Sequence, residues 1–193
     1  FSKNFNTFFK TMGSTWDTKH KNYILENFRL LREASYDSTI RVGDDTVKAN
    51  TAVLARSPVF ERTLQAPMIE TKEKVISISD FSVGAVRRLV DFLYESDFCS
   101  EKLNLDELLE LLAISHKYEV NALVDLVCDA VRNQVTASNC VKVLKFVDIY
   151  SQAEAHAPPP EEDKEKPLKR ARIDGGAITN LRNKAIEKVS ESV

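Results

Sequence analysis

Residues 36–60 read YDSTIRVGDDTVKANTAVLARSPVF, and the hydrophobic period changes inside this stretch. Ser38–Val42 and Thr46–Ala49 alternate apolar and polar side chains, which is typical of half-buried strands. Between them, Gly43–Asp45 suits a tight turn. The stretch therefore predicts a β-hairpin near the start of the fold.

The second half of the stretch is helical in character. Thr51–Arg56 predicts a short helix. Ser57 and Pro58 predict the start of the next one, because serine is a favoured N-cap and proline suits the first helical position. That helix carries Phe60 and Leu64 as apolar residues.

Outside the stretch, alternation predicts a third strand at Val75–Ile78. Asn104 and Glu107 form a pattern like a capping box at the start of a helix. Apolar residues at helical spacing predict helices at Lys19–Ala34, Ser82–Tyr94, Asn104–Tyr118, Val120–Gln134 and Asn139–Gln152. The pattern indicates an α+β fold, mostly helical, in which a short three-stranded sheet is enclosed by helices.

Residues 153–177, AEAHAPPPEEDKEKPLKRARIDGGA, have almost no apolar side chains to bury, which predicts a disordered linker. After it, Ile178, Leu181 and Ala185 begin one more amphipathic helix, continued by Ile186 and Val189. An isolated apolar stripe must pack on something. We expect it to close a helical hairpin with the helix before the linker.

The composition is that of an ordinary globular chain: 193 residues, 43% hydrophobic, 29% charged, a net charge of −2 and a pI near 6.0. It predicts neither a nucleic-acid nor a membrane partner. The chain begins at Phe1, so we expect a fragment. Cys99, Cys128 and Cys140 are an odd set without CxxC spacing, which favours a reducing, intracellular compartment.

No sequence motif predicts catalysis. The histidines are His20, His116 and His156, and none shares zinc-ligand spacing with a cysteine. Carboxylate pairs such as Glu161-Glu162 fall in the expected linker, which cannot hold catalytic geometry. We expect a non-enzymatic protein without a metal or cofactor.

Several spaced blocks resemble the BTB/POZ domain, over about residues 20–135. The blocks are Tyr36–Val42, Val47–Leu54, Ala55–Phe60, Val75–Asp80, Leu89–Tyr94, Leu108–Ala113 and His116–Tyr118. The resemblance divides the chain into an N-terminal arm (1–18), a BTB/POZ domain (19–135), a post-BTB helical extension (136–152 and 178–193) and the linker insertion (153–177).

The extension is similar to that of cullin-3 adaptors, including the MATH-BTB (speckle-type) group. The resemblance implies a homodimerising adaptor that recruits cullin-3 for substrate ubiquitination. The alternative is a self-associating scaffold of a nuclear or transcriptional regulator that does not bind cullin-3. No substrate-binding domain is recognisable, so the substrate stays open.

Many of these adaptors carry an apolar-x-Glu motif after the helix that begins Ser-Pro-Val-Phe, and its apolar residue contacts cullin-3. Met68 and Glu70 match that motif, and Tyr118, Glu119 and Val120 fall on the surface that the family uses. Without the resemblance, Met68 packs into its own domain and Glu70 begins a solvated charge run.

BTB domains pair through the first helix and the helix after the second strand, which implies a dimer interface at Ile24, Phe28, Leu31 and Val53. The alternative is that this stripe packs on its own domain. One departure from the family bears on the same region, because Asn50-Thr51 stands where members usually have His-Lys. That histidine belongs to a charged pocket near the dimer interface.

Lys169, Arg170 and Arg172 form a short basic cluster inside the linker. Such clusters serve as nuclear-import signals, and they also occur in solvated linkers without that role. The expected location is the nucleus, the cytoplasm or both.

Overall fold

The structure is a computed structural model that describes residues 20, 23–24, 26–27, 30, 32, 34–66, 74–95, 98, 102–155 and 176–191. The described residues of the expected first helix are helical as far as Ser35. The elements that follow are β1 (Ser38–Val42), β2 (Asp45–Ala49), α3 (Thr51–Leu54), α4 (Pro58–Gln65), β3 (Val75–Ser77), α6 (Val83–Glu95), α7 (Leu105–Lys117), α8 (Asn121–Gln134), α9 (Cys140–Ala155) and α10 (Gly176–Ser190).

The three strands form one mixed sheet in the order β2-β1-β3. β1 pairs antiparallel with β2 and parallel with β3, and Ile40 lies opposite both Val47 and Ile76. Gly43 makes the hairpin turn with φ +59°, a conformation that glycine adopts without steric cost. The hairpin and the third strand form where they were predicted, although β2 begins one residue earlier, at Asp45, and β3 ends one residue earlier, at Ser77.

One face of the sheet is buried and the other is open among the described residues. Ile40, Val47 and Ile76 are buried, whereas Arg41 and Thr46 on the opposite face are exposed. This alternation is the strand period expected when helices cover one face only.

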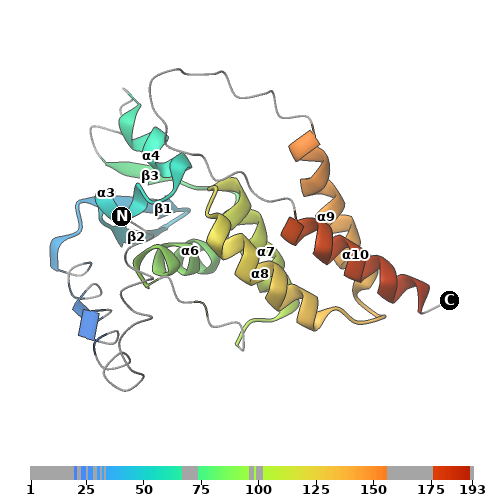
Figure 1. Cartoon of the computed structure of the whole chain (residues 1–193). Coiled ribbons are helices and arrows are strands. Elements are labelled where there is room, and N and C mark those ends of the chain that lie inside the picture. Colours follow the sequence, from blue (N-terminus) through green and yellow to red (C-terminus); the bar gives the residue numbers. More distant parts are fainter. Residues whose placement is uncertain are drawn as a thin grey trace.

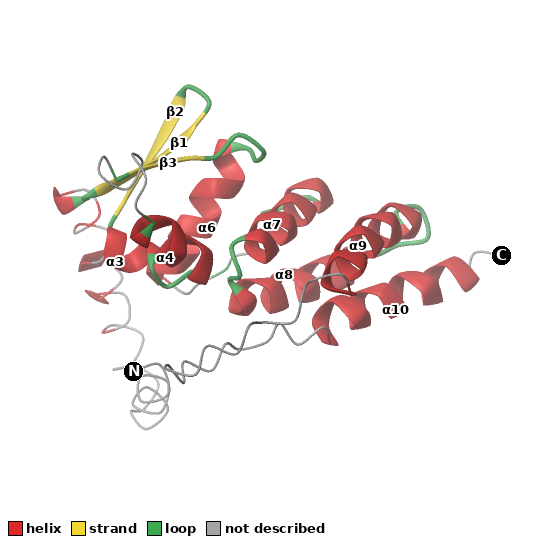
Figure 2. Ribbon diagram, turned by 90° about the horizontal axis from the view of Figure 1, so that it is seen from above, coloured by secondary structure: helices red, strands yellow, loops and turns green. Residues whose placement is uncertain are grey.

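The helices form a row that leads away from the sheet (Figures 1 and 2). α6 packs on β2, α7 packs on α6, and α8 pairs with α7. At the far end, α10 packs against both α8 and α9. The core is continuous from Ile40 in the sheet to Ala185 in α10. The fold class is therefore α+β, mostly helical, as the sequence indicated.

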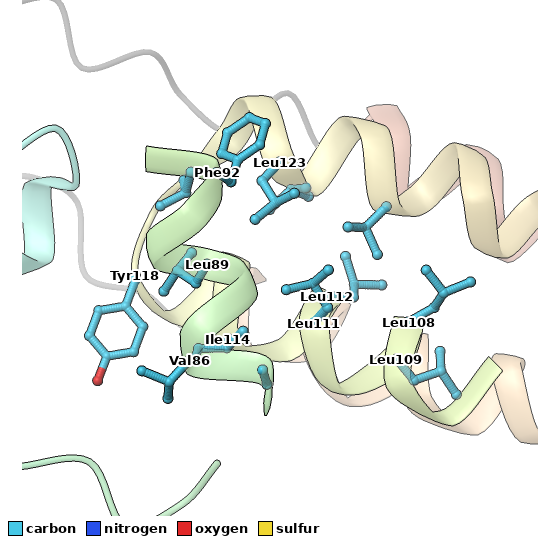
Figure 3. Close-up of a cluster of buried hydrophobic side chains, with 14 of the residues drawn as sticks. Val86, Leu89, Phe92, Leu108, Leu109, Leu111, Leu112, Ile114, Tyr118 and Leu123 are labelled. Carbon is cyan, nitrogen blue, oxygen red and sulfur yellow. The ribbon is translucent and has the colours of Figure 1, made fainter. Parts of the chain in front are cut away.

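The centre of the core lies where α6, α7 and α8 meet (Figure 3). Leu89 of α6, Leu108 and Leu111 of α7, and Leu123 of α8 are fully buried. Leu109 and Leu112 of α7 are buried as well, so α7 buries leucines on more than one side rather than on a single narrow stripe.

Two helix starts follow from local chemistry as predicted. The Oγ of Ser57 accepts a hydrogen bond from the backbone N–H of Phe60, and Pro58 is the first residue of α4. Asn104 and Glu107 form a complete capping box at the start of α7.

The helices beside the predicted linker are longer than expected. α9 continues to Ala155 instead of ending at Gln152, and α10 begins at Gly176. Ala-Glu-Ala at 153–155 has high helix propensity, and the composition rule for linkers does not weigh this. Residues 156–175, which include His156, Glu161-Glu162 and the basic cluster, lie outside the described residues.

The last helix packs as its apolar stripe predicted. Ile178, Leu181 and Ala185 are buried against α9 and also against α8, which the sequence did not suggest. Ile186, counted in the stripe, is 40% exposed because it points off the buried face. The hairpin of α9 and α10 is thus a layer of the main core.

Two of the three cysteines are buried free thiols, Cys128 and Cys140, and Cys99 lies outside the described residues. Burial raises the pKa of the Cys128 thiol to about 12, so it stays protonated and acts as a small apolar side chain. None of the helices in the described part of the chain is long and apolar enough to cross a membrane.

Candidate protein-interaction surfaces

The start of α4 is fastened to the turn between α7 and α8. The buried Ser57 Oγ donates a hydrogen bond to the carbonyl oxygen of Tyr118 at 2.6 Å. The rings of Phe60 and Tyr118 stack with their centroids 4.3 Å apart. These contacts join two segments that are 61 residues apart in the sequence and hold them as one rigid surface.

Three expected contact residues lie on this turn, and they differ in exposure. Tyr118 and Val120 are only 6% and 7% exposed, so their side chains belong mainly to the core. Tyr118 lies at the edge of the core cluster (Figure 3), and burial raises its pKa to about 12. Glu119 lies partly in solvent, and its carboxylate accepts a hydrogen bond from Arg62 of α4 at 2.7 Å.

The backbone of the turn forms a Schellman motif, which satisfies the last carbonyl groups of α7. The N–H of Glu119 donates to the oxygen of His116, and the N–H of Val120 donates to the oxygen of Ser115. Glu119 takes a left-handed conformation, with φ +54°.

A second ion pair lies beside this turn. Lys117 Nζ is 2.6 Å from Asp80, and both side chains are about half exposed. The same ammonium group lies 5.5 Å from the ring centroid of Phe81 and 5.9 Å from that of Tyr118. Charges of both signs therefore surround an aromatic centre.

Met68 and Glu70, the residues of the expected cullin motif, lie outside the described residues. They belong to the connection between α4 and β3, and Arg62 lies in the last turn of α4 just before it. Among the described residues, the Arg62–Glu119 ion pair thus links the last turn of α4 to the turn after α7.

The expected dimer face is described only in part. Ile24 in the first helix and Val53 in α3 are half-buried, and Val53 packs against the core. In the same first helix, Tyr23 and Leu30 are 67% and 61% exposed. Phe28 and Leu31 lie outside the described residues.

Asn50 holds three parts of the domain together. Its backbone N–H donates to the hydroxyl oxygen of Tyr94 at 2.7 Å, and its Oδ1 accepts from that hydroxyl at 2.6 Å. Its Nδ2 donates to the carbonyl oxygen of Ser35 at 2.7 Å. Asn50 thus joins the end of the first helix to α6, a role that an asparagine amide can fill with one donor and one acceptor.

Charged groups complete this junction. Arg32 donates to the carbonyl oxygen of Lys48 at 2.9 Å and forms an ion pair with Asp91 at 2.5 Å. Asp37 accepts from the backbone N–H of Thr51 at 2.7 Å and pairs with Lys74 at 2.9 Å. Burial alone raises the pKa of Asp37, but the Lys74 and Thr51 hydrogen bonds outweigh it and hold this pKa below its ordinary value.

Within the described ranges, no three His, Cys, Asp or Glu side chains lie close enough to bind a metal ion. The polar residues that the structure brings together make ion pairs and backbone hydrogen bonds. They form surfaces that suit contact with proteins.

Sequence reasoning missed Arg62, Arg32, Asp80 and the contacts of Asn50. Their partners lie 57, 59, 37 and 44 residues away in the chain, respectively. No local pattern carries that information. For Asn50 the sequence did carry one signal of a special role, because the family usually has a histidine at that position.

Comparison with known proteins gives one consistent result. The family model of the BTB/POZ domain matches residues 25–135. Among curated proteins, a BTB and MATH domain-containing protein of Caenorhabditis elegans is 33% identical over 119 residues, which cover 60% of this chain and 28% of that protein. This chain therefore spans about a quarter of the length of that relative.

Two solved structures are similar. The BTB domain of zebrafish PATZ1 has a TM-score of 0.49 and 22% identity, covering 64% of this chain and 98% of that domain. The BTB domain of human Gigaxonin has a TM-score of 0.49 and 18% identity, covering 62% of this chain and 96% of that domain.

Proposed function

Since the chain belongs to the BTB/POZ domain family and is a protein-protein interaction module, we propose that it is a homodimerising adaptor that recruits cullin-3 for the ubiquitination of a bound substrate. One observation carries the proposal. α4 and the turn after α7 form a single surface, because Ser57 and Phe60 at the start of α4 fasten it to Tyr118.

The chemistry of this surface suits a protein partner. It presents two partly exposed ion pairs, Arg62–Glu119 and Lys117–Asp80, and the ammonium group of Lys117 lies near the rings of Phe81 and Tyr118. Charged groups of both signs orient a partner and select against wrong ones. In the sequence, Met68 and Glu70 lie in the connection between α4 and β3.

The curated relative supports the adaptor class, because its name joins a BTB domain to a MATH domain. In the adaptors that this chain resembles, such a separate domain binds the substrate. The substrate partner proposed here is therefore a protein held by a domain other than the BTB/POZ unit.

The test is a titration of the purified protein with the N-terminal domain of cullin-3 by isothermal calorimetry. We expect binding in the micromolar range or tighter, and a loss of at least about tenfold for Met68→Asp because it places a charge at an apolar contact. Ile149→Asp on α9 is the matched control, since Ile149 is 66% exposed at the far end of the molecule. Absence of heat with the unmodified protein at tens of micromolar would rule out the adaptor function.

Self-association is the second part of the proposal. Tyr23 and Leu30 leave apolar area exposed on the first helix, and Ile24 lies among them. Covering such a face with a second copy removes it from water.

The second candidate is a self-associating scaffold of a nuclear regulator, favoured by the basic cluster Lys169, Arg170 and Arg172. The same titration separates the two, because the scaffold forms the dimer and does not bind cullin-3. Nuclear or cytoplasmic location is then read from the distribution of a fluorescent fusion with and without the cluster.

A further inference from the structure

Glu119 occupies a position that suits glycine. It is the first residue beyond the C-cap of α7, and its φ of +54° is a conformation that a β-carbon disfavours. The two hydrogen bonds of the Schellman motif come from backbone N–H groups and do not need its side chain. The geometry of the helix end therefore does not require a glutamate at position 119.

The ion pair of Glu119 with Arg62 does not explain the glutamate through stability either. The side chains of Arg62 and Glu119 are 50% and 37% exposed, and a pair this open to solvent contributes little to folding. The turn is held in place by Ser57 and by the stacked rings of Phe60 and Tyr118, whatever residue stands at 119. A charged side chain thus occupies a position with positive φ, and neither the helix end nor the ion pair explains it through stability.

The surroundings indicate what the pair is for. Arg62 is next to the connection that carries Met68, and Glu119 is next to Lys117, whose pair with Asp80 flanks Phe81. On this surface, charges of opposite sign alternate in reach of a single partner. Such a pattern is complementary to a protein surface that brings a basic group to Glu119 and an acidic group to Arg62.

We propose that Arg62 and Glu119 form one charge-selecting contact for the partner, and that their mutual ion pair opens on binding as each side chain takes an opposite charge from the partner. Arg62 is thereby a specificity-determining residue alongside Met68. The inference rests on the proposed function and deepens it, because it assigns the charge pattern of the cullin-binding surface.

The test uses Glu119→Gly and Glu119→Gln in the full chain, with thermal denaturation and calorimetric titration against the N-terminal domain of cullin-3. Glu119→Gly relieves the strained conformation, so we expect an equal or higher melting temperature together with about tenfold weaker binding. Glu119→Gln keeps the backbone and the shape but not the charge, and we expect a similar loss of binding. Glu119→Gly that is clearly less stable would show a structural role for the glutamate and overturn the proposal.

Lys74→Gly is the matched control. Lys74 is the other non-glycine residue with positive φ in the described part of the chain, at +52°, and its ion pair with Asp37 has nearly the same exposure. We expect the same effect on melting temperature and unchanged binding. If Lys74→Gly weakens binding as much as Glu119→Gly, backbone flexibility rather than the charge is responsible, and the proposal is wrong.

Arg62→Gln completes the set. It should weaken binding by a similar factor, and the affinity of the unmodified protein should fall more steeply with salt than that of Arg62→Gln. If the unmodified protein does not bind, the proposed function fails. If it binds and all three variants bind equally well, only the present inference fails.

Discussion

At the scale of single residues, the structure depends on side chains that serve two segments at once. Ser57 caps α4 by accepting from Phe60 and fastens the α7–α8 turn by donating to Tyr118. Asn50 likewise joins Ser35 and Tyr94. The sequence predicted the first role of Ser57 because capping is local. It could not predict the second, because the partner is distant in the chain.

Replacing Ser57 by alanine tests this double role. The change removes the cap and leaves a buried carbonyl oxygen without its donor, so we expect a loss of about 1–3 kcal/mol in the free energy of unfolding. Chemical denaturation measures it. Ser138→Ala, at an exposed turn, is the control and should change stability by less than about 0.5 kcal/mol. Equal effects of the two changes would contradict the role given to Ser57.

The raised pKa of Tyr118 predicts a loss of stability at high pH. The folded-state pKa is about 12 and the ordinary value is 10.0, so the neutral phenol is favoured by folding. The stabilisation is fully present below pH 10 and is lost as the pH rises from 10 towards 12.

Denaturant titrations across this range, on the unmodified protein and on Tyr118→Phe, measure the effect. Phenylalanine cannot ionise, so the variant should lose less stability over the same interval. The raised pKa values of Cys128 and Tyr94 act equally in both proteins and cancel in the comparison. Parallel pH curves would show that Tyr118 ionises as an ordinary tyrosine.

At the scale of elements, periodicity predicted which segments are helices and strands, and it erred at their ends. β2 begins one residue before the predicted strand, and α9 continues three residues past its predicted end. The apolar stripe of α10 predicted that it packs on α9. It could not show that the same stripe also covers α8, because one helix face can serve two neighbours.

The docking of α10 can be tested by cutting the chain. A protease site engineered between residues 160 and 170 should give two fragments that still elute together, because Ile178, Leu181 and Ala185 are buried in the main core. Adding Leu181→Ala should cost about 2–5 kcal/mol and allow the C-terminal fragment to separate. Ile186→Ala is the control, since Ile186 is 40% exposed. Separation without any substitution would show that α10 is held only by the covalent link.

At the scale of the whole molecule, the proposed self-association surface includes the described residues of the first helix. Light scattering at micromolar concentration should therefore report twice the monomer mass of 21.8 kDa. Leu30→Glu should shift the mass towards the monomer, because it buries a charge in an apolar contact. Val141→Glu, at an exposed site on α9, should leave the dimer intact. A monomer at every concentration would exclude the dimer.

The place of α10 between α8 and α9 has a consequence for biosynthesis. α8 and α9 make little contact with each other, and α10 packs against both of them. A ribosome completes α9 before it has made Gly176–Ser190, so until then the parts of α8 and α9 that α10 covers are exposed, although α8 already packs on α7. During that interval the unfinished layer is a natural target for chaperones, and α10 covers it once it has been translated.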